Sequence, residues 1–99
     1  MRIYRTIGET MGKMVLIYRI SPEGIEETEQ VEKAIPEKIK EFGKLTDLKR
    51  TPIAFGLEAI TIAIVTEAKG TEGITEKIEQ ALKDIEGVSS VENIGMNLL

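Results

Sequence analysis

The feature that most constrains the fold is an apolar run at residues 57–65, whose only polar members are Glu58 and Thr61. β-branched side chains make up most of the run, and such side chains suit the pleated surface of a sheet. A run this short that is apolar on both faces is typical of a central strand rather than a helix. The sequence therefore predicts that a buried β-strand organises this chain.

A turn precedes the run and consists of Pro52-Ile53-Ala54-Phe55-Gly56. A proline and a glycine on either side of an aromatic residue indicate a rigid turn. Two interpretations of Phe55 remain open. The ring can belong to the core beneath a tight turn, or a fixed loop can present it to a partner.

Composition excludes several classes of protein. The chain has 99 residues, which predicts one domain, and it contains neither cysteine nor histidine. Disulfides, thiolate chemistry, and the commonest general base and metal ligand are therefore excluded. A net charge of −4 argues against nucleic acid as a direct ligand and favours a basic protein partner. Neither a signal peptide nor a membrane-spanning run is evident, so we expect a cytoplasmic protein without a membrane partner.

Hydrophobic periodicity predicts the other elements. We expect residues 1–10 to be a flexible N-terminal extension and residues 11–99 to form the domain. Strands are expected at residues 14–20, 45–51 and 88–99, and the polar second one is expected at a sheet edge. A first helix is expected to begin with Thr28 as its N-cap, to be kinked or broken at Pro36 and to stop at Gly43. A second helix is expected after Thr71, which can cap it.

The order strand–helix–strand occurs twice, which predicts an α+β fold of the ferredoxin-like βαββαβ type. It would be a sandwich of a four-stranded antiparallel sheet with two helices on one face. The first and third strands are central in this topology, so Ile60, Ile62 and Ile64 should lie beneath the helices. The opposite face would be open, either as a contact surface or as plain solvated sheet. Residues expected on it are Leu57, Ala59, Thr61, Ala63 and Val65.

The sequence contains no recognisable catalytic constellation. The serines have no histidine to activate them, and the carboxylates are expected mostly on solvated helix faces. We therefore expect a binding or regulatory module rather than an enzyme, with no cofactor, metal or small-molecule ligand. One alternative is a ferredoxin-like regulatory or ligand-binding domain that dimerises through its open sheet face. An RNA-binding module is disfavoured, because exposed aromatics on the central strands are lacking.

Three segments carry a resemblance to a known family. They are residues 52–57, Gly70-Thr71-Glu72 and Gly87-Val88-Ser89-Ser90-Val91-Glu92. Together with the spacing of the elements over residues 11–99, they resemble archaeal translation elongation factor 1-beta, a guanine-nucleotide exchange domain family. The resemblance implies exchange of GDP for GTP on elongation factor 1-alpha during translation. It also implies that the turn contacts this partner through Phe55, with Pro52, Ile53 and Gly56 beside it.

The C-terminal tail departs from the eukaryotic members of that family. Their penultimate lysine reaches the partner's magnesium site, whereas Leu98 occupies that place here. The resemblance still implies partner contacts at Met96 and Asn97. Lys49 and Arg50, near the end of the second expected strand, lie close to the turn in sequence and are candidates to supply the missing charge instead. The tail can equally be the last strand of the sheet.

Overall fold

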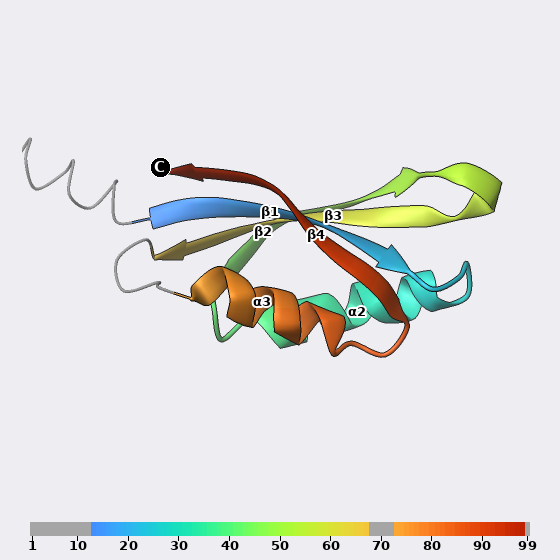
Figure 1. Cartoon of the computed structure of the whole chain (residues 1–99), viewed down its shortest axis with the longest axis horizontal. Coiled ribbons are helices and arrows are strands. Elements are labelled where there is room, and N and C mark those ends of the chain that lie inside the picture. The colour runs from blue at the N-terminus through green and yellow to red at the C-terminus, as the bar shows by residue number, and fades with distance from the viewer. Residues whose placement is uncertain (1–12, 68–72, 99) are drawn as a thin grey trace, which may run out of the picture.

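The computed structural model describes residues 13–67 and 73–98. In this part of the chain, four antiparallel strands form one sheet in the order β2-β3-β1-β4, and two helices cover one face (Figure 1). The predicted ferredoxin-like βαββαβ sandwich is confirmed. The expected extension at residues 1–10 and the proposed cap Thr71 lie outside the described residues. The elements are β1 (Lys13–Pro22), α2 (Glu27–Ile39), β2 (Lys44–Pro52), a 3-10 turn (Ala54–Gly56), β3 (Glu58–Glu67), α3 (Ile74–Lys83) and β4 (Val88–Leu98).

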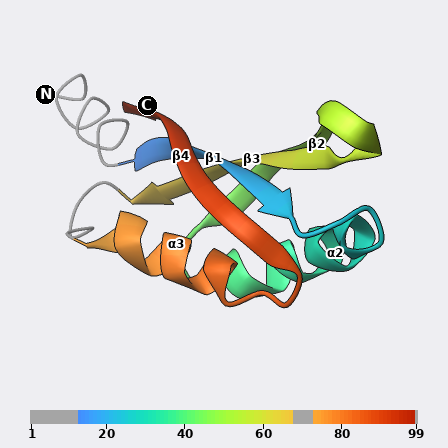
Figure 2. The same cartoon turned by 45° about the vertical axis from the view of Figure 1, so that its right-hand side comes forward.

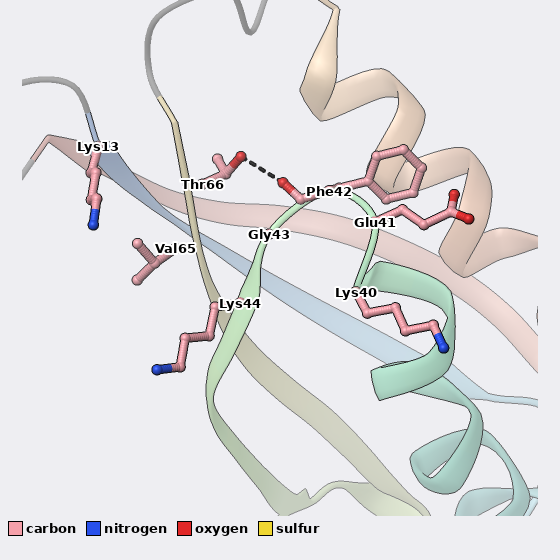
Figure 3. A pocket seen from close by; sticks show the side chains of 8 residues that line it. All are labelled: Lys13, Lys40, Glu41, Phe42, Gly43, Lys44, Val65 and Thr66. Carbon is pink, nitrogen blue, oxygen red and sulfur yellow. Dashed lines mark hydrogen bonds between the residues drawn. The ribbon is translucent and has the colours of Figure 1, made fainter.

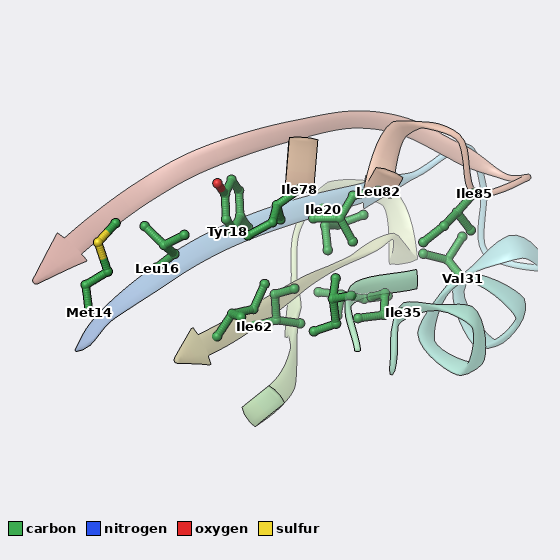
Figure 4. Packing of buried hydrophobic residues seen from close by; sticks show 13 residues of the cluster. Met14, Leu16, Tyr18, Ile20, Val31, Ile35, Ile62, Ile78, Leu82 and Ile85 are labelled. Atoms are coloured by element: carbon green, nitrogen blue, oxygen red, sulfur yellow. The ribbon is translucent and has the colours of Figure 1, made fainter. Parts of the chain in front are cut away.

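The two central strands carry the core. The antiparallel pairs beneath the helices are Leu16 with Ile64, Tyr18 with Ile62, and Ile20 with Ile60. These six side chains are at most 1% exposed. Figure 4 shows the buried side chains of both helices packed against this row. The period of two along each strand therefore sets which face is buried, as predicted.

Helix α2 differs from its prediction at its start. Its N-cap is Glu26, and Thr28 lies inside the first turn, 4% exposed, with its hydroxyl donating to the Gly24 carbonyl over 3.3 Å. The prediction of Thr28 as the cap was wrong, because the chain already turns at Ile25, whose carbonyl accepts from the Thr28 amide. The helix also runs through Pro36 as one element. Pro36 is exposed, so water can solvate the carbonyl that the proline leaves without a donor.

Gly43 lies between α2 and β2, but it does not end the helix, which stops at Ile39. A Cβ atom at this position would lie 2.6 Å from the Val65 carbonyl oxygen and 2.8 Å from a methyl group of Ile64. Close passage of the backbone over β3 therefore requires glycine here. The Thr66 hydroxyl fixes the same crossing, because it donates to the Phe42 carbonyl over 2.7 Å.

The outer strands follow the prediction, whereas the open face departs from it at two residues. The polar strand β2 is an edge, and β4 is the other edge, so the C-terminal tail is a strand paired with β1. On the open face, Thr61, Ala63 and Val65 are partly exposed, whereas Ala59 is 1% exposed. Because the side chain of Ala59 is a single methyl group on a central strand, it exposes little surface. Leu57 precedes β3 and is therefore not part of the sheet.

An ionic clamp joins α2 to the β2–β3 hairpin. The Arg50 guanidinium donates to Glu32 through Nη2 over 2.7 Å and through Nε over 3.1 Å. Its Nη1 lies 3.5 Å from Glu58 Oε1 at the start of β3. The hydrogen bonds from Arg50 lower the pKa of the Glu32 carboxyl. Arg50 is thus already engaged in two ion pairs, which argues against the expectation that it supplies charge to a partner.

We predict that Gly43→Ala lowers the free energy of unfolding by about 1–3 kcal/mol, because the added methyl group must displace backbone on β3. Gly24→Ala is the matched control, since its Cβ would meet only the flexible Glu27 carboxylate. Urea denaturation of both variants measures the difference. Equal stability of the two variants would contradict the close approach.

We predict that Glu32→Gln destabilises the protein at neutral pH but not in strong acid. The pKa of Glu32 is lowered in the folded state, so its contribution is present above the ordinary value of 4.5 and is lost as pH falls through the folded value. Urea midpoints of wild type and variant should differ at pH 7 and converge at about pH 2. Glu29→Gln, which removes an exposed pair with Lys33, serves as the control.

Candidate functional site

The tip of the β2–β3 hairpin presents two large apolar side chains to solvent. Phe55 is 93% exposed and Ile53 is 46% exposed, and Pro52 and Gly56 are exposed beside them. The interpretation of Phe55 as a core residue was therefore wrong, and the expectation of an exposed ring is confirmed. The turn lies at the end of the molecule opposite the C-terminal end of β4 (Figure 1).

The backbone holds Phe55 in a conformation that bulky residues rarely adopt. Its φ is 62° and its ψ is 31°, which is the left-handed region, and Gly56 follows with a φ of 78°. Such a conformation costs about 1–2 kcal/mol for a residue with a Cβ atom. Two hydrogen bonds close the turn: the Ile53 amide donates to the Leu57 carbonyl over 2.8 Å, and the Leu57 amide donates to the Ala54 carbonyl over 3.1 Å. A strained, closed turn with an exposed ring is a pattern typical of functional sites.

Sequence reasoning missed Ile25, in the loop between β1 and α2. Its side chain is 62% exposed, and its Cδ1 lies 3.4 Å from the position that a Cβ of Gly56 would occupy. The side chain therefore lies beside the hairpin tip. Figure 2 shows the loop between β1 and α2 on the same side of the molecule as that tip. The one signal in the sequence is an isolated isoleucine after Gly24 that precedes the buried stripe of the following helix.

Met96 and Asn97 lie far from the hairpin tip. Both are exposed, Met96 by 55%, and they pair with Leu16 and Val15 near the end of β4. Leu16 also pairs with Ile64, six residues along β3 from Glu58 at the tip. At about 3.3 Å per residue, the two groups are separated by roughly 20 Å along the sheet. The expected contact residues thus form two separate surfaces.

A shallow hollow of about 360 Å³ lies near the tail end of the sheet, where α2 gives way to β2 (Figure 3). Three lysines line it: Lys13, Lys40 and Lys44. Figure 3 shows Lys13 and Lys44 on the same side of β3 as Val65, whereas Lys40 extends on the side of α2, where its Nζ lies 3.9 Å from a carboxylate oxygen of Glu37. Lys13 begins the strand whose next residue, Met14, pairs with Leu98. Positive charge therefore lies beside the tail, although the penultimate residue is apolar.

Within residues 13–67 and 73–98, no group of three or more acidic side chains is arranged to hold a metal ion. The same part of the chain contains no helix that is long and apolar enough to span a bilayer.

A comparison of folds supports the architecture alone. The ACT domain from the GTP pyrophosphokinase of Chlorobium tepidum superposes with a TM-score of 0.58 and covers 83% of this chain and 99% of its own, at 19% identity. At that identity, a similar fold does not indicate a shared function.

Sequence comparisons are more specific. The family model described as the EF-1 guanine nucleotide exchange domain matches residues 15–99. Elongation factor 1-beta of Methanothermobacter thermautotrophicus is 39% identical over 83 residues, 83% of this chain and 91% of that protein. Elongation factor 1-beta of Metallosphaera sedula is 36% identical over 90 residues, 90% of this chain and 98% of that protein. The chain belongs to the family of EF-1 guanine nucleotide exchange domains that includes the archaeal elongation factors 1-beta.

Proposed function

We propose that the protein promotes exchange of GDP for GTP on elongation factor 1-alpha by contacting that GTPase at both ends of its sheet. Exchange activity in translation elongation follows from membership of the family. Two points are our proposal: the contact residues, and the use of two separate surfaces. We expect the protein to act in the cytoplasm, where elongation takes place.

The observation that carries this proposal is the exposed, strained Phe55. A ring that is 93% exposed contributes no burial to the folded monomer, yet the turn holds it in an unfavourable conformation. Rigid aromatic side chains bind with little loss of conformational entropy and often dominate interfaces. Pro52, Ile53 and Gly56 shape the turn around the ring, and we assign all four residues to the partner contact.

Exchange requires only differential binding. A protein that binds the nucleotide-free GTPase more tightly than the GDP-bound form must weaken GDP binding by the same factor. No covalent bond is made or broken in this process, so the contact surfaces suffice for the activity. Phe55 supplies an anchor at one end, and Met96 and Asn97 would make the contact at the other end.

We also propose that Lys13 and Lys44 supply the positive charge that the tail lysine provides in the eukaryotic relatives. Both lie on the open face next to Val65, at the end of the sheet where β4 terminates. A cation brought near the magnesium and phosphate site of the GTPase weakens retention of the metal ion by like-charge repulsion.

The protein should accelerate release of labelled GDP from elongation factor 1-alpha, and Phe55→Ala should lower the efficiency of release by about thirtyfold, as for loss of a hot-spot anchor. Phe55→Gly should impair release equally but exceed Phe55→Ala in stability by about 1 kcal/mol, because glycine adopts the left-handed conformation freely. Stopped-flow release and urea denaturation measure the two effects. Release no faster than the spontaneous rate with wild-type protein would refute the function.

Lys13→Ala combined with Lys44→Ala should lower the maximal rate of GDP release severalfold, because the charge acts on the bound complex. Lys77→Ala combined with Lys83→Ala on α3 is the charge-matched control and should leave that rate unchanged. Saturation curves at constant ionic strength separate the maximal rate from the half-saturating concentration. Equal maximal rates for wild type and the first variant would exclude these lysines from the role.

A further inference from the structure

We propose that Ile25 is an additional contact residue for elongation factor 1-alpha and forms one docking surface with the hairpin tip. This inference rests on the proposed function and extends its contact to a second element of the fold. The described residues expose five large apolar side chains, which fall into two groups. Ile25, Ile53 and Phe55 lie at the tip and are called the tip surface below; Ile94 and Met96 lie on β4.

Ile25 and the hairpin tip are in contact range although they are distant in sequence. The Cδ1 atom of Ile25 would be 3.4 Å from a Cβ atom at Gly56, which is ordinary van der Waals distance. Because Gly56 has no side chain, nothing at that position covers Ile25 on the side that faces the turn. Ile25 therefore borders Gly56, which directly follows the exposed Phe55 in the chain.

The loop that carries Ile25 is fixed on both sides. Before it, the Glu23 amide donates to the Gly87 carbonyl over 2.7 Å. After it, the Thr28 amide donates to the carbonyl of Ile25 itself over 3.3 Å, and the buried Thr28 hydroxyl donates to Gly24 over 3.3 Å. The backbone at Ile25 is thus held in place, while the residue stays 62% exposed. A loop whose backbone is already ordered loses little conformational freedom on binding.

The chemistry of the tip surface indicates that a protein binds to it. None of its three side chains carries charge, whereas the exposed carboxylates of Glu23 and Glu26 flank Ile25 in the loop. An apolar centre with a polar rim is the usual organisation of a protein interface. Since Ile25 adjoins the residues assigned to the GTPase contact, we assign it to the same contact with elongation factor 1-alpha.

The test is a saturation curve for GDP release from elongation factor 1-alpha with full-length variants. Ile25→Ala should raise the half-saturating concentration by about fivefold to twentyfold and leave the maximal rate unchanged, because the contact adds affinity only. Ile25→Leu, which keeps apolar volume, should restore wild-type affinity. Glu76→Ala truncates an exposed side chain near the start of α3, away from the tip surface, and should act like wild type. Thermal unfolding of each variant should match wild type, since Ile25 is mostly exposed.

Three outcomes would overturn the inference. If the half-saturating concentration for Ile25→Ala equals that of wild type while Phe55→Ala is impaired in GDP release, Ile25 makes no contact with the GTPase. The exchange function would then still stand. If Ile25→Ala weakens exchange only in proportion to a lower unfolding temperature, and Ile25→Leu does the same, the residue is structural. If sedimentation shows that Ile25→Ala disrupts a homodimer without altering exchange, the surface joins two copies of this chain. No acceleration by wild-type protein would instead refute the exchange function itself.

Discussion

The pairing of β1 with β3 is the interaction on which the rest of the structure depends. Its helix-facing side chains, from Leu16 to Ile20 and from Ile60 to Ile64, supply the part of the core that both helices cover. A slip of one residue in this register would turn the buried side chains of the shifted strand towards water, so the register is strongly determined. Both outer strands are aligned by pairing with these two, and the positions of the hairpin tip and the tail follow from that alignment.

The hairpin tip combines rigidity with exposure. The sheet fixes the two strands that lead into it, the clamp of Arg50 with Glu32 and Glu58 ties the hairpin to α2, and two backbone hydrogen bonds close the turn. These constraints together hold Phe55 in its left-handed conformation. Strain of this kind persists only where the surrounding structure over-determines it. The strained turn leaves the ring of Phe55 exposed at the end of the hairpin.

The sheet topology also determines where the positively charged side chains of Arg50, Lys13 and Lys44 lie. Arg50 was a candidate for action on a partner because it precedes the turn in sequence, but its side chain faces α2 and is engaged there. Lys13 and Lys44 are distant in sequence and converge because β1 and β2 both flank β3. Proximity along the chain was therefore a poor guide to which cations are available at the tail.

The sequence by itself determined the fold class, the central strands, the buried stripes and the turn around Phe55, because these follow from local periodicity and from proline and glycine chemistry. Only the tertiary structure decided that Phe55 is exposed, that Ile25 lies beside it and that Met96 and Asn97 lie at the other end. It also decided that Gly43 is needed for a close approach rather than for ending a helix. Exposure and contact depend on which distant segments pack over a residue, and a local pattern carries no information about them.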